Sequence, residues 1–133
     1  MRFKFAVPVL LAACLVSAVA IAANDKVEAT FQSLQASGVT GEAVLDALPG
    51  GGTRIHVSLR GLEPNAIYTS STFEISQECG VGTPSVMLEQ FTANPAGVIN
   101  FNRKVPQEIT SISSISVVRV SDSSLQACAP VTQ

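Results

Sequence analysis

The spacing of its apolar runs is the feature that most constrains how this chain can fold. After the first 22 residues, short runs rich in β-branched side chains recur roughly every 10 to 15 residues, separated by Gly, Pro and Asn. No stretch there repeats its apolar residues with the period of an α-helix. The clearest run covers residues 53–60, where Ile55, Val57 and Leu59 alternate with polar side chains. These runs therefore predict strands that each bury one face.

We expect strands at residues 27–36, 39–48, 53–60, 66–76, 86–93, 97–105, 116–120 and 125–131. Residues 109–116 are expected to form a crossing loop. Seven or eight such strands in a chain of 133 residues predict a single all-β domain. The expected architecture is an antiparallel Greek-key β-sandwich or flattened barrel.

The first 22 residues have the anatomy of a secretory signal peptide. Residues 1–4 are basic, residues 5–19 are apolar, and residues 20–22 read Ala-Ile-Ala, a small-residue cleavage pattern. Residues 1–22 are thus predicted to be removed, which leaves a domain over residues 23–133 that is exported, either periplasmic or secreted. One alternative stays open, because residues 11–14 read Leu-Ala-Ala-Cys, a lipobox that would leave Cys14 as a lipidated, membrane-anchored N-terminus.

The residues that would remain after cleavage argue against some kinds of binding site and partner. Cys79 and Cys128 are the two cysteines left, and an even pair in an exported protein predicts a disulfide. Six basic side chains stand against ten acidic ones, a net charge of −4, which argues against a nucleic-acid partner. The chain has a single histidine, His56, so a metal site built from several imidazoles is not expected.

Several segments in order resemble the copper, zinc superoxide dismutase family. Residues 38–41 (Gly-Val-Thr-Gly) and 60–64 (Arg-Gly-Leu-Glu-Pro) are similar to its second and third strands and their Gly-Leu-x-Pro turn. Residues 91–98 (Phe-Thr-Ala-Asn-Pro-Ala-Gly-Val) are similar to its Thr-Ala-x-x-x-Gly-Val hairpin. Residues 125–128 (Leu-Gln-Ala-Cys) resemble its closing Arg-x-Ala-Cys, and Cys79 lies where the family has the disulfide partner. The resemblance implies that family's β-sandwich.

The same resemblance implies that the metal ligands are missing. The family holds copper and zinc through about six histidines and an aspartate, but its ligand positions correspond here to Ser70, Thr72, Met87 and Arg119. The arginine that guides superoxide corresponds to Leu125. Hydroxyl groups do not replace imidazole as copper ligands. No metal cofactor and no superoxide dismutation are therefore expected.

The polar face of residues 53–60 is the main candidate surface. Arg54, His56 and Arg60 share it, and a simple hairpin would place Asp46 near Arg54 and Glu42 within reach of Arg60 or His56. One interpretation is a solvated face with cross-strand charge pairs, and the other is a basic patch that binds an anionic partner. The doublet Arg103-Lys104 ends a strand and is expected to protect a sheet edge.

Hydrolytic chemistry has weaker support. Serine is plentiful over residues 111–124, and Asp46 and Asp122 are available, but no Gly-x-Ser-x-Gly elbow is present. Glu74 and Glu78 are interpreted as surface charge. The hydroxyl-rich segment 68–73 either lines a polar pocket or covers the sheet.

These observations favour a non-catalytic, metal-free, exported module of the superoxide dismutase-like kind, with a binding or structural role in the periplasm or cell envelope. An envelope protein is the expected partner, since the inactive superoxide dismutase-like domain of the copper chaperone of this family docks on the true enzyme. The alternative is a metal-binding superoxide dismutase-family protein, active in superoxide metabolism or metal handling, whose ligands do not follow this alignment. It would require His56 to converge with carboxylates such as Glu42 or Asp46, within one chain or across a dimer. Oligomeric state and any small ligand stay open.

Overall fold

The computed structural model describes residues 25–133 as an eight-stranded, all-β fold. The strands are β1 (Lys26–Ser33), β2 (Thr40–Ala47), β3 (Thr53–Arg60), β4 (Ile67–Phe73), β5 (Val86–Thr92), β6 (Ile99–Val105), β7 (Ser114–Arg119) and β8 (Ser124–Pro130). A single 3-10 turn, η1 (Ile109–Ser111), lies in the segment expected to be a loop. The predicted fold class is confirmed. The predicted signal peptide and Cys14 lie outside the described residues.

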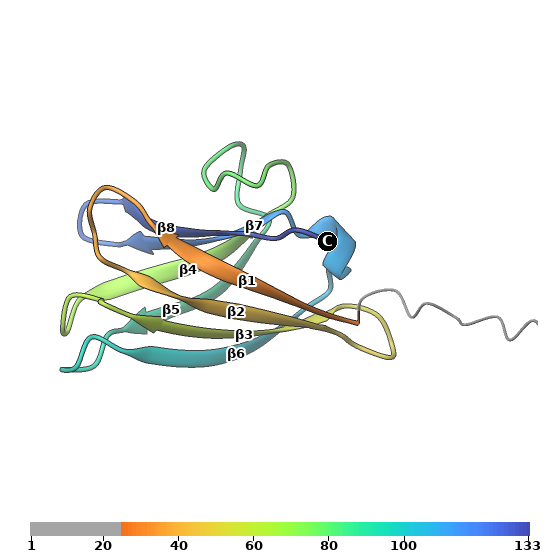
Figure 1. The fold of residues 1–133 in the computed structure, drawn as a ribbon, viewed down its shortest axis with the longest axis horizontal. Helices are drawn as coiled ribbons and strands as arrows, with labels where there is room; N and C mark the ends of the chain where they lie inside the picture. Colours follow the sequence, from red (N-terminus) through yellow and green to blue (C-terminus); the bar gives the residue numbers. More distant parts are fainter. Residues whose placement is uncertain (1–24) are drawn as a thin grey trace, which may run out of the picture.

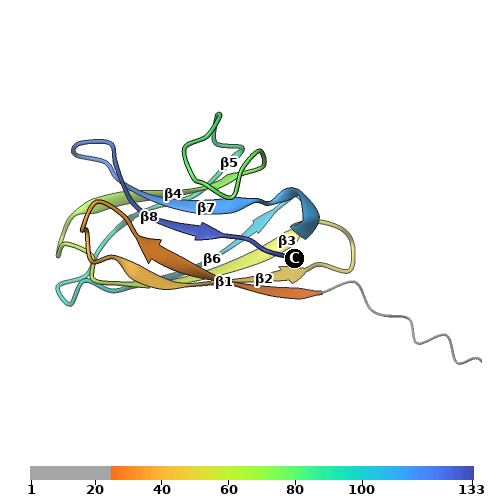
Figure 2. The ribbon, with the colours of Figure 1, turned by 45° about the horizontal axis from the view of Figure 1, so that its top comes forward.

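All strand pairs are antiparallel, in the order β5-β4-β7-β8-β1-β2-β3-β6 (Figure 1). The sheet is flattened into two layers, with β4, β5, β7 and β8 over β1, β2, β3 and β6 (Figure 2). The chain crosses between layers after β3, β5 and β6, which gives Greek-key connections. On one side the layers are joined by only two residue pairs of β1 and β8, Gln32 with Cys128 and Ser33 with Ala127.

The core forms between the layers because each strand alternates its side chains. On β3, Ile55, Val57 and Leu59 point inward and are 0–2% exposed, as predicted. Three aromatic rings from different strands fill the side of the core near β5 and β6. Tyr68 stacks on Phe91 with ring centroids 5.7 Å apart, and Phe91 lies 5.6 Å from Phe101.

Close backbone contacts explain why glycine stands at positions 41 and 61, which lie in segments that resemble the superoxide dismutase family. A Cβ atom on Gly41 would lie 2.0 Å from the carbonyl oxygen of Ser58, on the paired strand β3. A Cβ on Gly61, where φ is +73°, would lie 2.2 Å from the carbonyl oxygen of Gly38. Residues 38–41 therefore pack backbone to backbone against residues 58–61, and only glycine fits at these two positions.

Strands β5 and β6 are the two edges of the sheet, and we call the gap between them the seam. Within residues 25–133, no backbone hydrogen bond joins these strands. Leu88 is the extra residue of a bulge in β5 and has no partner on β4. Its carbonyl oxygen accepts a hydrogen bond of 2.9 Å from Arg103 Nε, and the same guanidinium forms an ion pair with Glu89. Arg103 thus bridges the seam from the edge strand on which it was expected.

Candidate functional site

Two of the positions that the sequence resemblance aligns with metal ligands, Ser70 and Thr72, lie inside the barrel. We call the four aligned positions ligand-equivalent. Both side chains are 0% exposed, because β4 pairs them with the inward-facing Val117 and Ile115 of β7. The Thr72 hydroxyl donates a hydrogen bond of 2.8 Å to Gln107 Oε1. The Ser70 hydroxyl is buried without a hydrogen-bond partner in the described part of the chain. These hydroxyl groups belong to the core, whereas the sequence had placed them in a pocket or on a covering surface.

The other two ligand-equivalent positions, Met87 and Arg119, do not lie together at one site. Met87 lies on β5 with 64% of its surface exposed, while Arg119 ends β7 and is held by carboxylates. Among residues 25–133, no three His, Cys, Asp or Glu side chains gather closely enough to hold a metal ion. The four positions therefore do not converge on one point.

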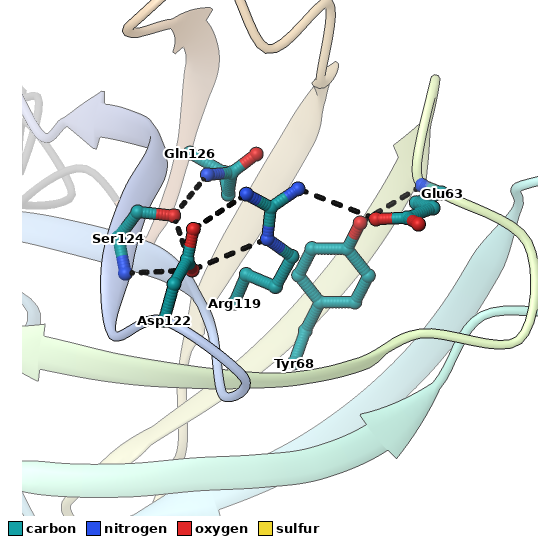
Figure 3. A network of polar contacts seen from close by, with 6 residues as sticks. All are labelled: Glu63, Tyr68, Arg119, Asp122, Ser124 and Gln126. Atoms are coloured by element: carbon teal, nitrogen blue, oxygen red, sulfur yellow. Dashed lines mark hydrogen bonds and ion pairs between the residues drawn. The ribbon is translucent and has the colours of Figure 1, made fainter.

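Arg119 is the centre of a polar network at one end of the barrel (Figure 3). Its Nε and Nη2 atoms donate to the two carboxylate oxygens of Asp122 at 3.2 and 2.6 Å, and Nη1 lies 3.2 Å from Glu63 Oε2. The Ser124 hydroxyl and backbone N–H both donate to Asp122 Oδ1, at 2.7 and 3.2 Å. Gln126 Nε2 in turn donates to the Ser124 hydroxyl. Every nitrogen of the Arg119 guanidinium is thus engaged.

The charges of this network suit a structural role. Hydrogen bonds from Arg119 and from Ser124 hold the pKa of Asp122 well below its usual range, and the bond to Asp122 raises the pKa of Arg119. Such a carboxylate is a poor proton acceptor. Glu63 also donates its backbone N–H to the Tyr68 hydroxyl, at 2.8 Å. The network therefore ties the β7–β8 turn to the loop between β3 and β4.

The predicted disulfide is present between Cys79, in the loop between β4 and β5, and Cys128 on β8, with Cα atoms 5.8 Å apart. Both cysteines pack with Phe73, against Leu34 and Leu125. Leu125, which the sequence resemblance aligns with the family's guiding arginine, is thus part of an apolar cluster. A depression of about 380 Å³ lies beside the disulfide, lined by Gln32, Leu34, Gln77, Glu78, Cys79, Cys128 and Pro130. A disulfide is consistent with a non-cytoplasmic protein.

The polar face of β3 is extended by β6. The register places Arg54 opposite Lys104 and His56 opposite Asn102, so that Arg54, His56, Arg60 and Lys104 form what we call the basic face. His56 Nδ1 lies 2.8 Å from Asn102 Oδ1, and His56 Nε2 lies 3.4 Å from the Ser58 hydroxyl. Sequence reasoning missed Lys104 and Asn102 here, because pairing of β3 with β6 is a long-range contact.

The β2–β3 hairpin places the expected charged residues near each other, but within residues 25–133 it forms no ion pair between them. Asp46 pairs with Arg54 and Glu42 with Ser58, so the hairpin prediction holds. The ion pairs among residues 25–133 are, however, those of Arg103 with Glu89 and of Arg119 with Glu63 and Asp122. The predicted Asp46–Arg54 ion pair is therefore absent there. Arg54 is exposed to water and Asp46 is half-buried, and ordering the two side chains would cost about as much as the pair would gain.

A depression of about 550 Å³ lies at the β6 side of the basic face. It is lined by Arg54, Asn102, Arg103 and Lys104. Three of these four residues are cations, and the fourth carries an amide that can donate hydrogen bonds. The depression can therefore attract and orient an anion.

The structure does not assemble a hydrolase triad in the part of the chain that it describes. Ser124 contacts Asp122, but His56 lies on β3 in the other layer and contacts Asn102 and Ser58. Glu74 accepts a hydrogen bond from Gln107, as a surface carboxylate can. The imidazole base is thus held apart from Ser124 and Asp122.

No helix among residues 25–133 is long and apolar enough to cross a membrane. A comparison with protein-family models finds no match for this chain, and a comparison with curated proteins finds no significant match.

Proposed function

We infer that this protein is a non-catalytic, metal-free binding module, exported to the periplasm or cell envelope and built on a superoxide dismutase-like barrel. The observation that carries the inference is how the reactive side chains are used. The cysteines form a disulfide, Arg119 and Asp122 neutralise each other, and Ser70 and Thr72 are buried in the core. The basic face, in contrast, presents charged groups to solvent.

The basic face is the surface that we assign to binding. Arg54, Arg60 and Lys104 are exposed, and the adjoining depression offers a concave contact. Strands hold the backbone that carries these side chains in place, so little backbone entropy is lost when a partner binds. An anionic partner fits the charge of this surface.

Export is supported by the leader over residues 1–22 and by the disulfide, which an oxidising compartment maintains. The superoxide dismutase-like kinship is supported by the order of the resembling segments and by the close packing of Gly41 and Gly61.

Mass spectrometry of the mature N-terminus tests the route of export. Cleavage after Ala22 is expected, whereas a lipidated Cys14 would show that the protein is membrane-anchored.

A metal-loading experiment tests the absence of catalysis. The exported, disulfide-bonded protein is stripped with a chelator and offered copper and zinc, and the bound metal per chain and the rate of superoxide consumption are measured. We expect neither stoichiometric metal nor an accelerated rate, because His56 is the one imidazole available. Stoichiometric metal with dismutation would overturn the proposal. His56→Gln is the matched variant, since metal that it retains cannot depend on the imidazole.

A further inference from the structure

The basic and acidic residues of this chain are segregated in space. Strands β3 and β6 carry four of its six basic residues outside the leader, Arg54, Arg60, Arg103 and Lys104, and none of its ten acidic residues. The domain as a whole has a net charge of −4. Because these two strands are neighbours in the sheet, positive charge is concentrated on one part of an otherwise acidic molecule. This concentration makes a local binding site for an anion.

Arg54 and Lys104 lie directly opposite each other on the neighbouring strands β3 and β6. These residues are register partners on antiparallel strands, so their side chains leave the same face of the sheet next to each other. Like charges in this position destabilise a sheet. Asp46 is the register partner of Arg54 on its other side, but it forms no ion pair with Arg54 within the described residues. An anion between Arg54 and Lys104 would remove the repulsion.

The surroundings of the pair are arranged to receive such an anion. Asn102 presents its amide oxygen to His56 Nδ1 at 2.8 Å, which leaves the amide N–H groups available to a ligand. Arg103 lines the same depression, and its guanidinium is held across the seam by Glu89 and the Leu88 carbonyl oxygen. The ion pair with Arg103 neutralises the Glu89 carboxylate.

The chemistry of these groups selects the ligand class. A guanidinium forms two parallel hydrogen bonds to phosphate oxygens, and an ammonium adds a compact charge. Two uncompensated cations favour a dianion over a carboxylate with one charge. A depression of about 550 Å³ also has room for an organic group attached to the phosphate.

We propose that the depression between β3 and β6 binds the phosphate group of a phosphomonoester, with Arg54 and Lys104 as its direct contacts and Asn102 as a neutral donor. This inference rests on the proposed function, since it names the ligand of the basic face. The phosphate can come from a soluble metabolite or from a lipid headgroup, and the chemistry at the protein is the same.

The test is a titration of the exported, disulfide-bonded protein, followed by the amide chemical shifts of β3 and β6. One arm uses glycerol 3-phosphate at low salt, and a second uses vesicles of phosphatidylcholine with or without phosphatidic acid. The test variants are Arg54→Gln and Lys104→Gln. The matched control is Lys26→Gln, which removes the same charge from β1.

We expect saturable shifts centred on residues 54 and 102–104, at least a tenfold weaker affinity in each test variant, and less than a twofold change in the control. Arg54→Lys should lose affinity too, since it keeps the charge but not the bidentate geometry. Saturation by glycerol 3-phosphate identifies a soluble ligand, and saturation only by phosphatidic acid vesicles identifies a lipid headgroup. Absence of saturation in both arms, or equal loss in the control, would overturn the inference. The metal-loading result is independent of either outcome, so the two proposals can fail separately.

Discussion

Removing the disulfide is the perturbation with the largest effect that the structure allows to be calculated. The bond joins Cys79 to Cys128 across 49 positions of the sequence. Closing a loop of that length lowers the entropy of the unfolded chain, which corresponds to about 4 kcal/mol of stability at 25 °C. A domain of this size has a total stability of roughly 5–15 kcal/mol. Reduction should therefore remove a large fraction of the free energy of unfolding.

The measurement is urea unfolding of the protein with and without reductant, followed by circular dichroism. We expect the free energy of unfolding to fall by about 4 kcal/mol and the melting temperature by roughly 15 °C. The dependence on urea should become steeper, because an unfolded chain without the cross-link exposes more surface. The double variant Cys79→Ala, Cys128→Ala serves as the control, since it should match the reduced protein and not respond to reductant.

Two results would refute this reasoning. A loss below about 1 kcal/mol, with full reduction shown by thiol titration, would mean that the unfolded chain is already restricted without the bond. A reduced protein that unfolds in two separate steps would mean that the bond holds a locally stable unit, and not the whole barrel.

Three further predictions concern side chains in the core, a close backbone contact and the polar network. Ser70→Ala should raise the free energy of unfolding by about 1 kcal/mol, because it removes a buried hydroxyl that has no partner in the described part of the chain. Thr72→Val should lower the free energy of unfolding by about 1 kcal/mol, because Gln107 Oε1 loses its donor. Urea unfolding checks both variants, and a loss of stability in Ser70→Ala would contradict the first expectation. Gly41→Ala should cost about 3 kcal/mol in the same assay because its Cβ would meet the Ser58 carbonyl oxygen, while Gly50→Ala, with no atom nearby, should stay within about 0.5 kcal/mol; similar losses in both would disprove the contact argument. The low pKa of Asp122 means that its ionised form stabilises the fold above about pH 4 and that this contribution is lost as the pH falls further. Asp122→Asn should therefore flatten the decline of the urea midpoint between about pH 5 and pH 2, and parallel declines in both proteins would show that the network does not couple to folding.

The fold could be predicted from the sequence wherever a strand has one polar and one apolar face. Residues 53–60 are such a case, and their inward and outward side chains were assigned correctly. Residues 68–72 are not, because hydroxyl groups stand at both alternating sets of positions and burial alone distinguishes Ser70 from Ser71. Polarity therefore carried no signal about the direction of the two ligand-equivalent side chains.

The candidate site depends on contacts between residues far apart in the sequence. The pairing of Arg54 with Lys104 joins strands separated by an excursion through β4 and β5, and no local motif encodes that register. The bulge at Leu88 likewise has no glycine or proline to indicate it. The sequence did mark Arg54, His56 and Arg60 as one face, since the period of a strand is local.

The position of β8 beside β1 has a consequence for when this protein can fold. A chain that emerges amino-terminus first holds β1 with an empty neighbouring edge until residues 124–130 follow. Pairing across almost the whole chain length slows folding to milliseconds or longer, since the intervening loop must close first. The barrel should therefore form only after residues 124–130 have been synthesised, because β1 has no partner on that side until then. Removal of the last ten residues would leave a polypeptide that never closes its core.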